Sequence, residues 1–148
     1  MPLFGPSGGT GGTAFDDESL FQPNSRLARI IVRSGTLVDA IEITHEITGV
    51  GTLITFGHHG GFGGSQQVLD LNLNLQPVRE HIILVEGRYG EFVDHIKITT
   101  SQGRVLSAGG GGGNASYQYE VVPGFEIAGF VGQSGSLLDA VGIVLRAL

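Results

Sequence analysis

The heptapeptide GSLLDAV at residues 135–141 has two earlier counterparts, GTLVDAI at 35–41 and GEFVDHI at 90–96. All three follow the pattern Gly-x-(Leu/Phe)-(Val/Leu)-Asp-x-(Ile/Val), which we call the aspartate motif. The copies recur about every 50 residues in a chain of 148. Such a period predicts three copies of one structural unit that together fill the domain.

Three glycine clusters alternate with the aspartate motif: GGTGG at 8–12, GGFGG at 60–64 and GGGGG at 109–113. The last glycine of each cluster precedes the next motif by 22 to 26 residues. From each motif aspartate to the next cluster is 21 or 15 residues, and 17 if the C-terminus is joined to the N-terminus. The order therefore closes on itself, and we predict a pseudo-threefold ring with neighbouring termini.

Short segments rich in β-branched and aromatic residues have the composition of strands and are separated by turn residues. They are 28–32, 41–48, 52–56, 68–75, 81–85, 96–100, 117–122, 127–131 and 141–145. No window sustains a capped amphipathic helical period. The best helical candidate, 140–148, contains Gly142, and its equivalence with the other repeats favours a strand. We predict an all-β chain of about a dozen short strands in three equivalent sheets.

Composition excludes several classes of protein. A hydrophobic content of 41% over 148 residues suits one globular domain. Only 15% of residues are charged, the net charge is −6 and Lys97 is the one lysine, which argues against nucleic-acid binding and polybasic membrane docking. The absence of cysteine excludes disulfides, thiolate nucleophiles, thiolate zinc sites and iron–sulfur clusters.

No segment has the length of a membrane-spanning helix, so membrane insertion is not expected. Residues 1–20 lack the basic and apolar regions of a secretory signal peptide. The localisation is therefore open between the cytoplasm and export without a leader.

Three interpretations compete for the glycine clusters. They could be tight turns in which glycine supplies a positive φ. They could hold a phosphate, but no Gly-Lys-Ser/Thr follows any cluster and no Gly-x-Gly-x-x-Gly occurs in the chain. They could bring backbone N–H groups close to a neutral polar ligand, which we favour because turns alone rarely need four or five glycines three times.

The aspartate of each motif complements such a cluster chemically. A lone aspartate in a loop is commonly an ordinary turn residue, but this one recurs three times in the same apolar setting. A carboxylate accepts hydrogen bonds from two hydroxyl groups, and exposed glycine N–H groups donate to ring and hydroxyl oxygens. The combination predicts recognition of an uncharged sugar.

Catalysis is not expected. Glycoside hydrolysis needs two carboxyl groups about 5–10 Å apart, whereas the repeats share one carboxylate and Glu91 adds a second in one copy only. We interpret the acidic residues 16–18 as a solvated turn, with calcium binding as the weaker alternative. Adjacent histidines at 58 and 59 would point to opposite faces of a strand, which disfavours zinc. We expect Asn114 to cap the third glycine cluster, and we predict no catalytic residue, metal or cofactor.

Over essentially its whole length the chain resembles the mannose-binding branch of the jacalin-related lectins. The resemblance lies in GPxGGxGGxxFDD at 5–17, GxSGxxLDA(V/I)G at 132–142 and the threefold repeat. It implies a single lectin domain over 1–148, folded as a type I β-prism of three four-stranded Greek-key sheets with pseudo-threefold symmetry. Galactose-specific members begin at a free glycine, whereas residues 1–7 precede the first cluster here, which favours mannose or glucose.

The resemblance also implies up to three monosaccharide pockets. Each aspartate would bind O4 and O6 of the sugar, the backbone amides two and three positions before it O5 and O6, and the last glycine of a cluster O3. The implied residues are Gly35, Thr36, Leu37 and Asp39 with Gly64; Gly90, Glu91, Phe92 and Asp94 with Gly113; and Gly135, Ser136, Leu137 and Asp139 with Gly12.

The implied partners are mannose- or glucose-containing glycans and glycoproteins, and a homodimer or larger homo-oligomer is expected. A member of the family carries tyrosine where this chain has Leu37, Phe92 and Leu137, so only Phe92 keeps an aromatic ring there. The alternative hypothesis is a β-prism module for protein interaction or assembly whose sugar sites are vestigial.

Overall fold

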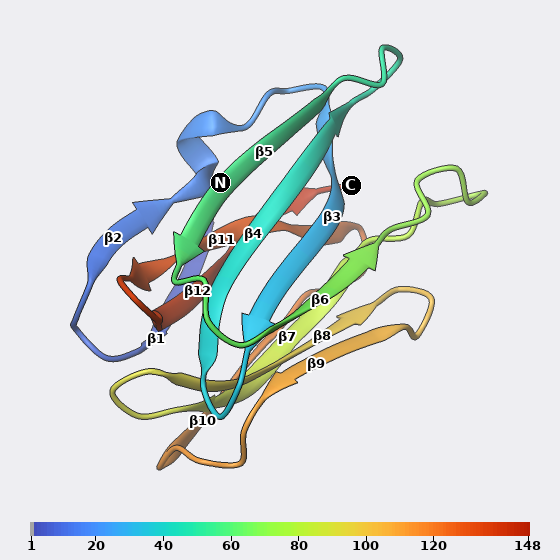
Figure 1. The fold of residues 1–148 in the computed structure, drawn as a ribbon. Coiled ribbons are helices and arrows are strands. Elements are labelled where there is room, and N and C mark those ends of the chain that lie inside the picture. The colour runs from blue at the N-terminus through green and yellow to red at the C-terminus, as the bar shows by residue number, and fades with distance from the viewer. Residues whose placement is uncertain (1) are drawn as a thin grey trace.

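The computed structural model describes residues 2–148, which form twelve β-strands and one short 3-10 helix (Figure 1). The strands are β1 (Leu3–Gly8), β2 (Thr13–Asp16), β3 (Ser25–Ser34), β4 (Val38–Ile47), β5 (Leu53–Gly60), β6 (Ser65–Asp70), β7 (Ile82–Tyr89), β8 (Val93–Thr100), β9 (Val105–Gly109), β10 (Ala115–Glu120), β11 (Phe125–Ser134) and β12 (Leu138–Ala147), and the helix is η1 (Asp17–Leu20). The prediction of an all-β chain is confirmed. No helix within residues 2–148 is long and apolar enough to cross a lipid bilayer.

Each repeated unit is built on an antiparallel hairpin whose turn holds the first three residues of an aspartate motif. β3 and β4 flank the turn at 35–37, β7 and β8 that at 90–92, and β11 and β12 that at 135–137. Two outer strands joined by a glycine cluster pair with each hairpin: β5 and β6, β9 and β10, and β1 and β2. The three units therefore share one topology.

The third unit is assembled from both ends of the chain. β1 pairs with β12 and β2 with β11, so N-terminal strands flank the C-terminal hairpin (Figure 1). The amide of Leu145 also donates to the carbonyl oxygen of Pro2 at 2.9 Å. The two ends thus complete one unit, in the way that the cyclic order of the motifs indicates.

The expectation of three separate four-stranded sheets is not confirmed. Strand pairing gives one four-stranded sheet, β5-β4-β3-β6, and one eight-stranded sheet that contains the other two units. The reason is a single bridge, Ile127 with Ile82, that joins β11 to β7. Within residues 2–148, no strand ladder joins the first unit to the other two.

The core is filled by aliphatic and phenylalanine side chains that the hairpin strands direct to one side. Their exposed fractions are 0–1%, and burial of each contributes about 1.5–3 kcal/mol relative to exposure. They include Ile30, Val32, Val38, Ile41, Ile43, Val85, Val93, Ile96, Ile98, Phe130, Val141 and Ile143. This packing holds the three hairpins, and therefore their turns, in fixed positions.

Strand boundaries differ from the prediction in two ways. The segments of β1, β2 and β9 were not predicted as strands, because β1 and β2 are short and their glycine, proline and aspartate residues are rare in strands. Their pairing with β12, β11 and β8 places them in sheets. The segment 140–148, by contrast, lies largely in β12, so its assignment to a strand is confirmed.

The prediction of a strand through 68–75 is wrong beyond Asp70, where β6 ends. The Asn72 side chain accepts a hydrogen bond from the amide of Asn74 at 3.1 Å, which bends the chain. The Asn72 amide donates to Glu80 Oε1 at 2.9 Å. The leucines that alternate with polar residues after Asp70 therefore lie in a turn, which the buried Glu80 carboxylate stabilises.

Glu80 is 1% exposed, and both of its carboxylate oxygens accept hydrogen bonds. Arg104 donates to it from Nη2 at 2.6 Å and from Nε at 2.9 Å, and the Thr100 hydroxyl donates at 2.6 Å. The hydrogen bonds from Arg104 contribute most to lowering the pKa of Glu80 from 4.5 to about 2. A carboxyl with a lowered pKa stabilises the fold above its unfolded pKa and loses this contribution as the pH falls.

We expect Glu80→Gln to lower the free energy of unfolding at pH 7 by about 2–3 kcal/mol. The difference from the wild type should shrink as the pH falls from 5 to 2, because protonation removes the same charge from Glu80. Urea unfolding of both proteins at several pH values measures this difference in the free energy of unfolding. A difference that is the same at pH 7 and pH 2 would contradict this role.

Candidate functional site

The aspartate motifs and glycine clusters lie together at one end of the sheets. In the first unit, Ser34 pairs with Ser65 and Ala40 with Gly60, so the cluster and the hairpin turn share that end. The other units have the same register, with pairs Tyr89–Ala115 and His95–Gly109, and Ser134–Thr13 and Ala140–Gly8. We call each motif with its cluster a cup, named after its aspartate: Asp39 with 60–64, Asp94 with 109–113, and Asp139 with 8–12.

One backbone hydrogen bond recurs in every cup. The amide of the second glycine of the cluster donates to the carbonyl oxygen of the motif aspartate. The bonds are Gly61 to Asp39 at 3.0 Å, Gly110 to Asp94 at 2.8 Å and Gly9 to Asp139 at 2.9 Å. The structure thus brings together the residues that the resemblance pairs: Asp39 with Gly64, Asp94 with Gly113 and Asp139 with Gly12.

The aspartate carboxylate faces the last two glycines of its cluster. A Cβ on Gly63 would lie 2.8 Å from Asp39 Oδ2, and one on Gly64 would lie 2.8 Å from Oδ1. The corresponding distances are 2.8 and 2.9 Å in the Asp94 cup, and 2.8 and 2.7 Å in the Asp139 cup. Gly64, Gly113 and Gly12 also have φ values of +70°, +90° and +74°. Only glycine permits this approach of backbone to carboxylate.

Each aspartate motif and its glycine cluster have unused hydrogen-bond donors. The turn is closed by its own glycine amide, as in Gly35, which donates to the carbonyl of Leu37 at 2.9 Å. Within residues 2–148, the amides of the next two turn residues and of the last cluster glycine donate to no protein acceptor. They are Thr36, Leu37 and Gly64; Glu91, Phe92 and Gly113; and Ser136, Leu137 and Gly12. Each cup therefore offers a carboxylate acceptor beside three free N–H donors.

A side chain from the hairpin orients the last glycine amide of each cluster. Arg33 Nε donates to the carbonyl of Gly63 and Nη2 to that of Gly64, both at 3.0 Å. The carbonyl of Gly63 and the amide of Gly64 belong to one planar peptide unit, so fixing the carbonyl also fixes the N–H.

The same support occurs in the other two cups. Arg88 donates to the carbonyls of Gly112 at 3.2 Å and Gly113 at 2.9 Å. In the third cup the support comes from the Gln133 side chain, oriented so that its amide nitrogen faces the cluster. This nitrogen donates to the carbonyl oxygens of Thr10 at 3.2 Å and Gly11 at 3.1 Å. These three residues were not predicted as part of the site, although each stands two positions before the motif glycine.

The three cups are not identical in burial. Asp139 is 6% exposed, and burial raises the pKa of its carboxyl above the usual value. Asp39 and Asp94 are of intermediate exposure.

The cups also differ in their aromatic side chains. The residue at the tip of the cluster is Thr10, Phe62 or Gly111. Phe62 is 79% exposed and stacks on His58, with ring centroids 4.4 Å apart and planes 4° apart. The Asp94 cup instead has Phe92 in its hairpin turn. Two of the cups therefore carry an aromatic side chain, and each carries it on a different loop.

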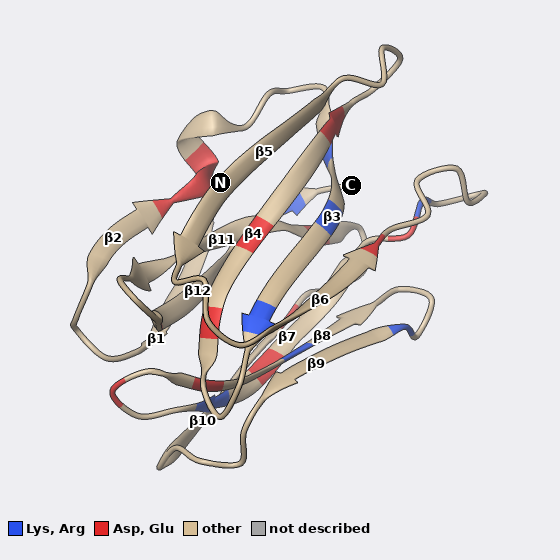
Figure 2. Ribbon diagram, in the orientation of Figure 1, with Lys and Arg blue, Asp and Glu red and all other residues tan. Residues whose placement is uncertain are grey.

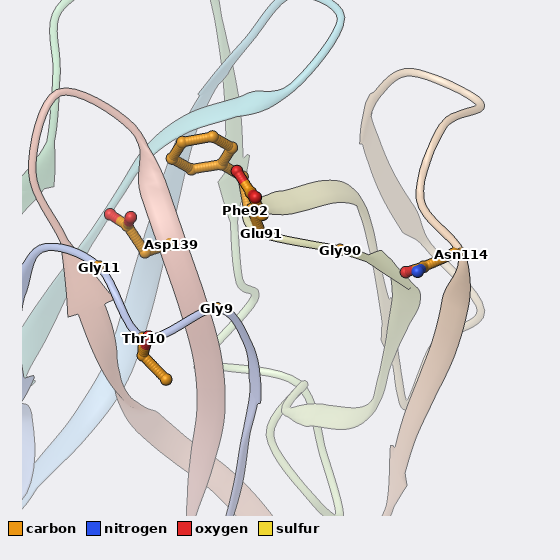
Figure 3. A pocket seen from close by; sticks show the side chains of 8 residues that line it. All are labelled: Gly9, Thr10, Gly11, Gly90, Glu91, Phe92, Asn114 and Asp139. Carbon is orange, nitrogen blue, oxygen red and sulfur yellow. The ribbon is translucent and has the colours of Figure 1, made fainter.

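A hollow of about 470 Å³ opens where the Asp139 cup meets the turn of the Asp94 cup (Figure 3). It is lined by Gly9, Thr10, Gly11, Gly90, Glu91, Phe92, Asn114 and Asp139. Asn114 was expected to cap the third cluster, but its side chain makes no hydrogen bond within the described residues and lies beside Gly90.

The prediction of a solvated turn at 16–18 is wrong for Asp17, which is 2% exposed. Its Oδ1 lies 2.7 Å from His59 Nε2, and the His59 ring stacks on Phe15 at 3.8 Å. His58 contacts the carbonyl of Gly61 at 2.7 Å instead, so the adjacent histidines have separate partners. No group of three or more His, Asp or Glu side chains within residues 2–148 could hold a metal ion.

Charged residues are sparse over the sheets, and acidic and basic residues occur together in small groups (Figure 2).

A model of the family "Jacalin-like lectin domain" matches residues 4–144. The chain is a jacalin-like lectin domain. The matched family is one of carbohydrate-binding lectins, so the prediction that this lectin is not an enzyme is confirmed.

Known relatives span the whole lectin. Horcolin of Hordeum vulgare is 33% identical over 147 residues, which cover 95% of this chain and 94% of horcolin. A Malaysian banana lectin superposes with a TM-score of 0.81 at 28% identity, covering 99% of both chains. AcmJRL, a mannose-binding jacalin-related lectin from Ananas comosus, superposes with a TM-score of 0.79 at 25% identity over 99% of this chain and 98% of its own. The jacalin-like β-prism fold is confirmed.

We expect Arg33→Ala to loosen the amide of Gly64 without changing the fold, because the guanidinium no longer holds the Gly63–Gly64 peptide. The ¹⁵N order parameter of Gly64 should fall from about 0.85 toward 0.6, while that of Gly113 stays unchanged. The matched variant Arg88→Ala should do the reverse. A Gly64 amide that is equally ordered in Arg33→Ala would contradict the orienting role.

Proposed function

We propose that each cup binds one hexose of the mannose or glucose type, so that one chain presents three sites to a high-mannose glycan. The observation that carries the proposal is the repeated set of one carboxylate and three free amides within a glycine-walled cup. Hydroxyl groups of the sugar would donate to the aspartate, and the free amides would donate to sugar oxygens. No step of covalent chemistry is required.

The assignment of atoms follows the family pattern. Asp39, Asp94 and Asp139 would accept from O4 and O6, the turn amides would donate to O5 and O6, and the last cluster glycine would donate to O3. The mannose-binding description of the Ananas comosus relative supports a mannose-type ligand. Segments 32–41 and 58–64 also resemble griffithsin, a member of the family, which favours retention of all three sites.

Single cups should bind weakly. Four to six hydrogen bonds contribute about 0.5–1.5 kcal/mol each, and part of this offsets the loss of sugar motion. We expect dissociation constants from millimolar to high micromolar, or about −4 to −6 kcal/mol. Three cups at one end of the molecule would raise avidity for a branched glycan by about 10²–10⁴. The expected homo-oligomer, which would raise it further, stays a prediction.

Isothermal titration with methyl α-mannoside should give about three sites per chain. Asp39→Ala, Asp94→Ala and Asp139→Ala should each remove one site, because the acceptor for two hydroxyls is lost. The triple variant should not bind mannan. Asp70→Ala is the matched control, since this exposed carboxylate pairs with Arg29 at the opposite end of β6 and should leave all sites intact.

The rival hypothesis of an assembly module with vestigial sugar sites predicts a different titration. Titration of the wild type with the mannoside would then give no saturable heat of binding, and titration of the aspartate variants would give the same result. Mannan binding by the triple variant would overturn the site assignment while leaving a lectin function elsewhere on the surface.

A further inference from the structure

The second glycine of each cluster also contacts a neighbouring cup. A Cβ on Gly61, in the Asp39 cup, would overlap the carbonyl oxygen of Ser136 in the Asp139 cup. A Cβ on Gly9 would overlap the carbonyl of Glu91, and one on Gly110 that of Thr36. The contacts run from the Asp39 cup to the Asp139 cup, from there to the Asp94 cup, and back to the Asp39 cup. The three cups therefore form a closed ring of backbone contacts.

Backbone strain does not account for glycine at these positions. The neighbouring Gly8, Gly60 and Gly109 have φ values of +142°, +125° and +104°, whereas Gly9, Gly61 and Gly110 do not lie in the left-handed region. Alanine could adopt their backbone conformation. What excludes a side chain there is the carbonyl oxygen of the neighbouring cup, against which the glycine Cα–H packs.

Each contacted carbonyl belongs to a peptide unit that faces the neighbouring pocket. The carbonyl of Ser136 and the amide of Leu137 lie in one plane and point in opposite directions. The Leu137 amide is one of the free donors of the Asp139 cup. The same relation joins the Glu91 carbonyl to the Phe92 amide in the Asp94 cup, and the Thr36 carbonyl to the Leu37 amide in the Asp39 cup.

We propose that Gly61, Gly9 and Gly110 are positioning residues for the neighbouring cup, each orienting a sugar-binding amide from behind. Gly61 acts on Leu137, Gly9 on Phe92 and Gly110 on Leu37. This inference rests on the proposed function and deepens it, because it makes the affinity of one cup depend on the backbone of the next. A larger residue at the second cluster position would displace the neighbouring turn rather than its own aspartate.

The test is a ¹⁵N-resolved titration with methyl α-mannoside that follows amides of the three turns separately. In Gly61→Ala we expect the Leu137 amide to shift before any sugar is added, and the Asp139 cup to weaken about tenfold. The Asp94 cup, which Gly61 does not touch, should change less than twofold. Gly110→Ala should weaken the Asp39 cup, and Gly9→Ala the Asp94 cup, in the same cyclic order.

The three variants control for one another. General destabilisation would weaken all cups alike in every variant, and loss confined to the cup that carries the substitution would also overturn the proposal. The shift of the Leu137 amide is measured without sugar, so it tests the contact even if the wild type binds no mannoside. In that case the proposed function fails, and a Leu137 amide unchanged in Gly61→Ala would refute the positioning role separately.

Discussion

Each cup depends on one close approach, that of a glycine backbone to the aspartate that follows a hairpin turn. The amide of the second cluster glycine bonds to the aspartate carbonyl at 2.8–3.0 Å in all three units. The last two glycines then lie against the carboxylate, where a Cβ would be within 2.7–2.9 Å of an oxygen. The high glycine content of the chain follows largely from this geometry, and the core holds the hairpins so that the approach is maintained.

The binding groups are mostly backbone amides, and these are oriented from behind. A planar peptide that is fixed at its carbonyl presents its N–H in a fixed direction. Arg33, Arg88 and Gln133 hold the carbonyl before the last cluster glycine, and the glycine of the adjacent cup packs on the carbonyl in the turn. A pocket built in this way loses little conformational freedom when a sugar binds, which suits ligands that offer only a few weak hydrogen bonds.

Much of this arrangement could be predicted from the sequence because it is repeated. The resemblance to the lectin family implied which glycine lies beside which aspartate, and the cyclic spacing of motifs and clusters also suggested the pair from opposite ends of the chain, Asp139 and Gly12. The edge strands β1 and β2 were missed because pairing, rather than composition, makes them strands. The strand predicted beyond Asp70 from alternating leucines was wrong, because the buried Glu80, ten residues further on, stabilises a turn there. Arg33 and Arg88 recur in the repeat, but their function depends on which carbonyls lie within reach, and only the fold determines that.

A crystal structure with methyl α-mannoside would show whether the cups bind sugar through the aspartates. We expect one hexose in each cup, with two hydroxyls within hydrogen-bond distance of the carboxylate of Asp39, Asp94 or Asp139. A third oxygen should accept from the amide of Gly64, Gly113 or Gly12. A hexose bound elsewhere, with the three carboxylates making no sugar contact, would contradict it.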